Sequence, residues 1–181
     1  MRSVIDQINH LVRWRLKKKL TPRYFLRRSV DPERKVRICH LVSDLEVGEV
    51  ASEVVHISNG LDPDDFLVGV LALGRRGYPA QRVEPRVQVW ALHDQGPVRP
   101  RTVWEAAREL REYGIHMLHT HGWDALMVGA AAAKVAGIPH LIHSQYRLPP
   151  LGNPGLLERS AASLALANTE QWVVNTEMVA E

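Results

Sequence analysis

Histidines gather in one short stretch of the chain, where they could ligate a metal, bind a hydroxyl or move a proton. His119 and His121 lie two residues apart, and Gly122 and Asp124 follow them closely. In a β-strand, residues two apart share a face, so both imidazoles would point the same way, with His116 on the other face. A zinc site needs three or four convergent ligands. Only two histidines and a possible third ligand, Asp124, are present, which is a thin set, so we expect no metal here.

His121 differs from His119 in its place along the predicted strand. His119 falls inside the strand and is typical of a hydrogen-bonded core histidine. His121 falls where the strand gives way to the next helix. A histidine at such an edge can hydrogen-bond a substrate hydroxyl or act as a base. We therefore predict that His121 is the catalytic residue.

A second polar stretch follows the next apolar segment and contains His143, Ser144, Tyr146 and Arg147. These side chains could bind a polyol such as a sugar, or they could simply end a strand in solvent. Arg147 could bind an anionic group.

A third candidate is the loop around Gly48, which follows a strand and leads into a helix. Such a loop can bind phosphate through free backbone N–H groups. Dinucleotide and P-loop glycine patterns are both absent, so we expect no nucleotide cofactor. Glu46 and Glu49 flank Gly48 and would repel a phosphate. Alternatively, Glu49 simply stabilises the start of the helix.

These candidates depend on a regular alternation of strands and helices. The patterns predict strands at 36–42, 66–73, 87–92, 115–120, 139–143 and 171–174, and helices at 49–61, 101–113, 123–136 and 156–167. Such alternation is typical of an α/β fold with a doubly wound, mostly parallel, Rossmann-like sheet. In that fold the site lies at the carboxyl ends of the strands, where all three candidates fall.

Charge divides the 181 residues into an arm and a body. Residues 1–37 hold twelve Lys/Arg and three Asp/Glu, a net charge of +9, and the rest carries −6. We predict a basic helical arm over residues 1–35, with residues 2–28 contacting an anionic membrane surface. A helix packed on the body, or a poorly ordered extension, is the alternative. Without a recognition motif, the charge does not indicate nucleic-acid binding.

Composition excludes several classes. The content of 45% hydrophobic and 24% charged residues is that of a globular domain, and Cys39 has no disulfide partner. The longest uncharged apolar run has nine residues, whereas a membrane span needs about 20. No signal peptide is evident. We expect a cytoplasmic protein, peripheral at the membrane surface.

Four stretches in order resemble the N-terminal domain of a GT-B glycosyltransferase of family 4, a large retaining family. They cover residues 36–181. The stretches are Arg37–Val42 with Gly48 and a helix ending at Asn59-Gly60-Leu61, Leu118-His119-Thr120-His121-Gly122, Gly137-Ile138-Pro139 through His143-Ser144, and Gln171–Glu177.

The resemblance implies specific roles. The domain would bind the acceptor, a sugar or a lipid-linked molecule, through His143, Ser144 and Tyr146. His121 would contact the transferred sugar, and Gly48 and Gly122 would approach the diphosphate of a nucleotide-sugar. Two positions depart from the family: Glu49 stands where small residues follow two glycines, and Tyr146 lies where a further histidine is common.

A whole enzyme of this type needs roughly two domains of this size. We therefore expect the donor domain in the same chain or another chain, and an inactive isolated chain. A fragment, a subunit of a split transferase and a non-catalytic Rossmann-like binding module all remain open.

Overall fold

The structure, a computed structural model, describes residues 35–94, 98–146 and 156–174. The predicted arm therefore lies outside the described residues, apart from Lys35, and so does Arg147. Within the described part of the chain, no helix is both long enough and apolar enough to cross a membrane.

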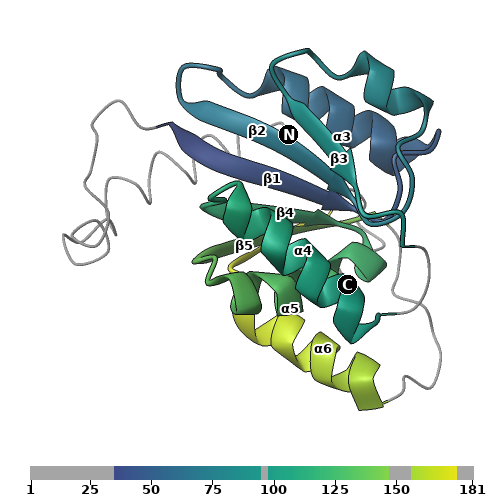
Figure 1. Ribbon diagram of the computed structural model, residues 1–181, viewed down its shortest axis with the longest axis vertical. Helices are drawn as coiled ribbons and strands as arrows, with labels where there is room; N and C mark the ends of the chain where they lie inside the picture. The colour runs from purple at the N-terminus through teal and green to yellow at the C-terminus, as the bar shows by residue number, and fades with distance from the viewer. Residues whose placement is uncertain (1–34, 95–97, 147–155, 175–181) are drawn as a thin grey trace.

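The described strands form one six-stranded sheet in which every neighbouring pair is parallel (Figure 1). Their order across the sheet is β3-β2-β1-β4-β5-β6. The strands are β1 (Val36–Val42), β2 (Phe66–Ala72), β3 (Gln88–Ala91), β4 (Met117–His121), β5 (His140–Gln145) and β6 (Gln171–Val174).

Helices connect the strands, and local residues explain where several of them begin and end. They are α3 (Glu49–Gly60), the short 3₁₀ helix η1 (Tyr78–Arg82), α4 (Pro100–Glu112), α5 (Trp123–Ala136) and α6 (Leu156–Asn168). Pro100 begins α4, a position that needs no backbone donor. Gly137 follows α5 in the left-handed conformation, with φ of 74°, which glycine adopts without steric cost.

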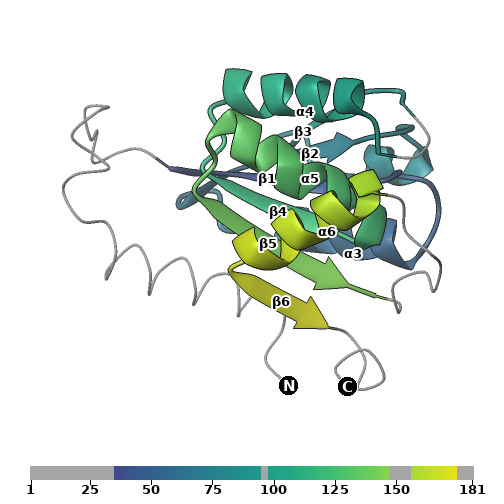
Figure 2. The same cartoon turned by 90° about the horizontal axis from the view of Figure 1, so that it is seen from below.

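The helices cover both faces of the sheet (Figure 2). On one face, α3 and η1 pack on Ile38 and Val42 of β1. On the other face, α4, α5 and α6 pack on Cys39 and Leu41. Gly129 of α5 lies so close to the sheet that a Cβ there would be 2.9 Å from the Leu41 side chain. Alternate residues of β1 therefore face different helices, as the pleat of a strand requires.

The strand order is that of a doubly wound Rossmann fold, and it reverses between β1 and β4. In the register of these two strands, Val42 pairs with His121 at the carboxyl ends. Ligands in such sheets bind in the crevice outside the carboxyl ends at this reversal point. The predicted fold class is confirmed, and the strand and helix bounds agree with the sequence patterns to within two residues.

Candidate functional site

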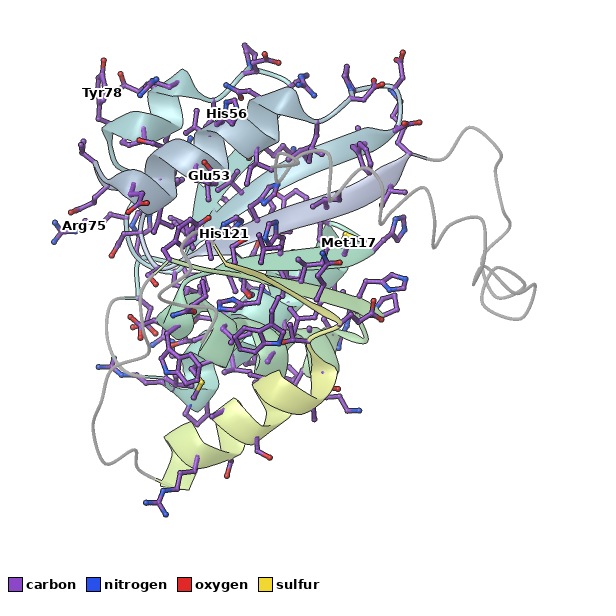
Figure 3. The ribbon with its side chains drawn as sticks, turned by 180° about the vertical axis from the view of Figure 1, so that it is seen from behind. Glu53, His56, Arg75, Tyr78, Met117 and His121 are labelled. Atoms are coloured by element: carbon purple, nitrogen blue, oxygen red, sulfur yellow. The ribbon has the colours of Figure 1, made fainter. Side chains whose placement is uncertain are left out.

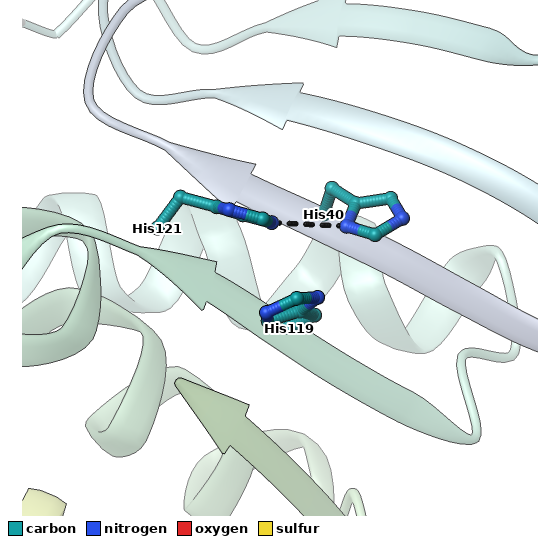
Figure 4. A group of neighbouring side chains, drawn as sticks. All are labelled: His40, His119 and His121. Carbon is teal, nitrogen blue, oxygen red and sulfur yellow. Dashed lines mark hydrogen bonds between the residues drawn. The ribbon is translucent and has the colours of Figure 1, made fainter. Parts of the chain in front are cut away.

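Three histidines lie together (Figure 4), on the face of the sheet that α3 covers. His40 of β1 pairs in register with His119 of β4, and His121 is the last residue of β4. Each is at most 1% exposed. Strand alternation explains the grouping, because His40 lies between Ile38 and Val42, which face α3.

Hydrogen bonds connect His121 to two neighbours. Its Nε2 lies 3.0 Å from Nδ1 of His40, and its Nδ1 lies 2.8 Å from the Tyr146 hydroxyl. Nε2 of His119 lies 2.8 Å from the Ser144 hydroxyl. Tyr146 follows β5 directly and is 8% exposed. These hydrogen bonds thus extend from the interior of β1 to the carboxyl end of β5.

Burial keeps these imidazoles neutral at physiological pH. Desolvation lowers the pKa of His40 from 6.5 to about 4. It also lowers the pKa of His119 and of His121 well below the usual value, and the neighbouring histidines add to the effect. A neutral imidazole has one N–H and one lone pair, so each ring can donate at one nitrogen and accept at the other.

Some ring nitrogens in this cluster lack a partner. Nε2 of His40 and Nδ1 of His119 are buried and make no hydrogen bond to the residues that the structure describes. Such nitrogens are uncommon in folded proteins, and a catalytic role or a bound ion or water is among the explanations for them. We define the histidine cluster as His40, His119 and His121.

Acidic residues of α3 lie near the outer end of the cluster. Burial raises the pKa of the Tyr146 hydroxyl, and the carboxylates of Glu53 and Glu49 raise it further. The phenol is therefore neutral and is available as a hydrogen-bond donor. Figure 3 shows Glu53 on α3, on the same face of the sheet as His121.

The two candidate glycines begin α3 and α5 at the reversal point. Gly48 precedes α3 in an extended conformation, and a Cβ there would meet nothing within 4 Å. Gly122 precedes α5 with φ of 83° and donates its N–H to the carbonyl of Ser144 at 2.9 Å. The backbone therefore favours glycine at 122, whereas the position of Gly48 suits other residues as well.

The loop before α3 is held in place by the loop after β2. Asp44 accepts a hydrogen bond from the backbone N–H of Arg75 at 2.7 Å. Leu45 donates its N–H to the Arg75 carbonyl at 3.0 Å. Gly77 allows this approach, because a Cβ there would lie 2.4 Å from the Leu45 carbonyl oxygen. Gly48 is thus placed by backbone contacts at the carboxyl end of the sheet.

His143 lies on the opposite face of the sheet from the histidine cluster. Its Nε2 donates to Oε1 of Gln145 at 2.6 Å, and its Nδ1 lies 2.9 Å from the Thr120 hydroxyl. Its ring also packs edge-on against Trp172. Adjacent residues of a strand point to opposite faces, so Ser144 joins the histidine cluster whereas His143 does not.

Comparison of the sequence with family models assigns a family. The model described as Glycosyltransferase Family 4 matches residues 50–181. This chain belongs to glycosyltransferase family 4. No curated protein matches the sequence.

Solved glycosyltransferases of the GT-B fold resemble this family 4 chain in structure. Anabaena HepE, solved in complex with UDP, matches with a TM-score of 0.57 and 20% identity, over 80% of this chain and 39% of that one. Acinetobacter baumannii MurG matches with a TM-score of 0.54 and 11% identity, over 77% of this chain and 41% of that one. The chain therefore spans about two fifths of the length of these structures.

The structure brings together most of the predicted site residues of the family 4 chain. His121, Ser144 and Tyr146 are joined directly or through the histidine cluster, and Gly122 is bonded to Ser144. Gly48 begins the helix that carries the acidic residues near Tyr146. His143 is separate, and its role in acceptor binding stays a prediction.

Sequence reasoning missed His40. This histidine lies inside the strand predicted at 36–42, and it was not singled out because no other histidine is near it in the sequence. Two signals could have revealed it. Alternation along the strand puts His40 on the same face as Ile38 and Val42, and the strand order of a Rossmann fold puts β1 beside β4. Each ring of the histidine cluster offers a nitrogen, and these atoms lie within 4.8 Å of one another.

Proposed function

We propose that this chain supplies the acceptor-side half of a retaining hexosyltransferase that uses a nucleotide-sugar donor. The observation that carries the proposal is the position of His121. It ends β4 at the point where the strand order reverses, in a chain that belongs to glycosyltransferase family 4. The complex of Anabaena HepE with UDP supports a uridine nucleotide as one candidate for the donor.

His121 is proposed to contact the transferred sugar. Both of its ring nitrogens are bonded already, to His40 and to Tyr146. A sugar hydroxyl must therefore replace one of these partners. Tyr146 is the partner at the strand end, and its hydroxyl makes the same kind of contact that a sugar hydroxyl would make. We propose that the sugar takes the place of the Tyr146 hydroxyl at Nδ1.

The remaining roles follow from position. Gly48 and Gly122 are proposed to face the donor diphosphate, because each begins a helix at the reversal point. Ser144 and Tyr146 are proposed to contact the acceptor. His143 lies on the opposite face of the sheet, so its predicted role in acceptor binding requires the acceptor to reach that face as well. A His143→Ala variant tests this role separately.

The donor domain is proposed to lie in the same chain or in another chain, so the isolated 181 residues would be inactive in transfer. One specific observation favours the alternative of a non-catalytic binding module. The carboxylates of Glu49 and Glu53 are near enough to raise the pKa of the Tyr146 hydroxyl. Negative charge at that place would repel the diphosphate of a donor.

Calorimetric titration of the chain with UDP-, GDP- and ADP-hexoses tests the proposal, with each free nucleotide diphosphate as a comparison. We expect one hexose donor to bind, and His121→Ala to weaken that donor at least about tenfold, since a lost hydrogen bond is worth about 1.4 kcal/mol. The free diphosphate should bind both proteins equally, because His121 contacts the sugar.

The matched control is His56→Ala, which removes an exposed histidine of α3. It should bind the donor like the wild type. If His121→Ala binds the nucleotide-sugars like the wild type, the proposed sugar contact is wrong. If none of them binds to either protein, this chain alone does not bind a donor, and only its acceptor-side role remains. Analysis of the anomeric product, once the donor domain is supplied, tests retention.

The basic arm has a separate proposed role in a cytoplasmic protein that is peripheral at the membrane. Residues 13–19 contain five Lys/Arg, together with Trp14 and Leu16, and such segments bind anionic lipid surfaces. A peptide of residues 1–28 should bind vesicles that contain phosphatidylserine and should be released by salt. Absence of binding to anionic vesicles would contradict this role.

A further inference from the structure

The geometry of the histidine cluster points to a metal site that shares His121 with the proposed sugar contact but uses the other nitrogen of its ring. His40, His119 and His121 come from two adjacent parallel strands and share one face. One nitrogen from each ring lies within 4.8 Å of the others. Two ligands at positions i and i+2 of a strand, with a third from the next strand, converge because the pleat directs all three to the same side.

We propose that His40, His119 and His121 form a buried Zn²⁺ site with three imidazole ligands. Borderline divalent metals prefer imidazole nitrogen, whereas Mg²⁺ and Ca²⁺ prefer oxygen. Three histidines are also the ligand set of zinc in carbonic anhydrase, where water takes the fourth position. A zinc site with three protein ligands keeps its fourth position for water, so the three histidines need no carboxylate as a fourth protein ligand.

Hydrogen bonds around two of the three histidines, His119 and His121, resemble the surroundings of metal ligands, whereas Nε2 of His40 has no partner among the described residues. A ligating histidine usually has its second ring nitrogen bonded to another group, which orients the ring. Tyr146 is bonded to Nδ1 of His121, and Ser144 is bonded to Nε2 of His119. These contacts direct Nε2 of His121 and Nδ1 of His119 to the metal.

Two further observations concern the atoms that would bind zinc. Nδ1 of His119 is buried without a partner among the described residues, which is a costly state for a polar atom. Nε2 of His121 and Nδ1 of His40 are only 3.0 Å apart (Figure 4). Zinc lies about 2.0–2.1 Å from each imidazole nitrogen, so a small separation of these two rings would admit the ion between them.

The inference goes beyond the proposed transfer function and does not depend on it. Zinc binding is measured with no sugar or nucleotide present. The sequence alone indicated too few ligands, and His40 supplies the missing third one.

The test uses the full chain without an affinity tag, stripped of metal with a chelator and titrated calorimetrically with ZnCl₂. Elemental analysis after dialysis counts the bound zinc. We expect one zinc per chain. His119→Ala and His40→Ala should each weaken binding by more than about 100-fold, because loss of a partner that only orients a ligand already costs 10–100-fold. The exposed-histidine control His56→Ala should bind like the wild type.

A second measurement does not depend on the folding of the variants. Co²⁺ replaces Zn²⁺ in such sites, and the wild-type chain should show the strong visible absorption of tetrahedral cobalt, which added Zn²⁺ abolishes. Wild-type chain that binds no zinc, or that shows only the weak absorption of octahedral cobalt, would overturn the proposal. So would a result in which His56→Ala loses zinc and His119→Ala retains it.

Discussion

Two polar clusters occupy opposite faces of the sheet near the carboxyl ends of β4 and β5, and they differ in completeness. Under α5 and α6, His143 is bonded at both ring nitrogens, to Thr120 and to Gln145. Under α3, the histidine cluster contains buried nitrogens with no partner among the described residues. Of the two clusters, only the one around His143 has every imidazole nitrogen hydrogen-bonded.

This difference indicates where ligand chemistry is to be sought. A satisfied polar network makes a core more rigid and specific, whereas a partly satisfied one lowers stability. A ligand that bound to the histidine cluster would satisfy its unpartnered nitrogens. The cluster beneath α3 also lies where the strand order reverses, between β1 and β4, whereas His143 lies on β5. We therefore propose that the site lies on the α3 face.

The largest expected effect is a loss of folding stability in acid that comes from the histidine cluster. Burial lowers the pKa of His40 from 6.5 to about 4. Between pH 6.5 and about pH 4, His40 is therefore more protonated in the unfolded chain than in the folded one. Its contribution to the free energy of unfolding is complete above pH 6.5 and is lost as the pH falls to about 4. At about 1.4 kcal/mol per pKa unit, the loss from His40 alone is about 3 kcal/mol. Urea unfolding at pH 7 and pH 4 measures it.

A His40→Gln variant separates this effect from the titration of carboxylates. The variant should lose less stability than the wild type between the two pH values. Equal losses in both proteins would show that His40 does not titrate in the folded state as its burial requires.

Thr120→Val tests the complete cluster on the other face. The change keeps the shape of the side chain but removes the hydroxyl that is bonded to Nδ1 of His143. A buried acceptor left unpaired costs about 1–3 kcal/mol, so we expect a loss of about 2 kcal/mol in urea unfolding. Binding of a nucleotide-sugar should not change. If Thr120→Val bound the donor more weakly than the wild type, the proposal that the donor binds on the α3 face would be wrong.

The two candidate glycines should give the smallest effects. Gly122 has φ of 83°, so Gly122→Ala should cost about 1–2 kcal/mol in thermal unfolding. Gly48→Ala has open space and extended backbone, so its effect on stability should stay within about 0.5 kcal/mol. Weaker donor binding in Gly48→Ala, without loss of stability, would support a direct contact with the diphosphate. Equal destabilisation by both changes would contradict the backbone argument.

Much of the fold could be predicted because its signals are local. The apolar run of β2 and the helix stop at Gly137 are properties of short segments, and both were located correctly. The position of His121 at a strand end followed from the same patterns. Family resemblance then added the roles, which no local pattern contains.

The contacts within the site could not be predicted, because they depend on register between distant strands. His40 and His119 are 79 residues apart in the chain and meet only through the pairing of β1 with β4. Tyr146 reaches His121 in the same way, through the pairing of β4 with β5. Grouping His143 with Ser144 overlooked the alternation of neighbouring residues, which the structure makes plain.

The central claim is that sugar binding occurs on the α3 face, through His121. The most direct measurement is to follow the histidine ring resonances of the ¹⁵N-labelled, metal-free chain by NMR while a nucleotide-hexose is added, with each resonance assigned by single His→Gln changes. The account predicts that the resonances of His121 and His119 shift, while those of His143 and the exposed His56 remain. Shifts at His143 with none at His121 would contradict it.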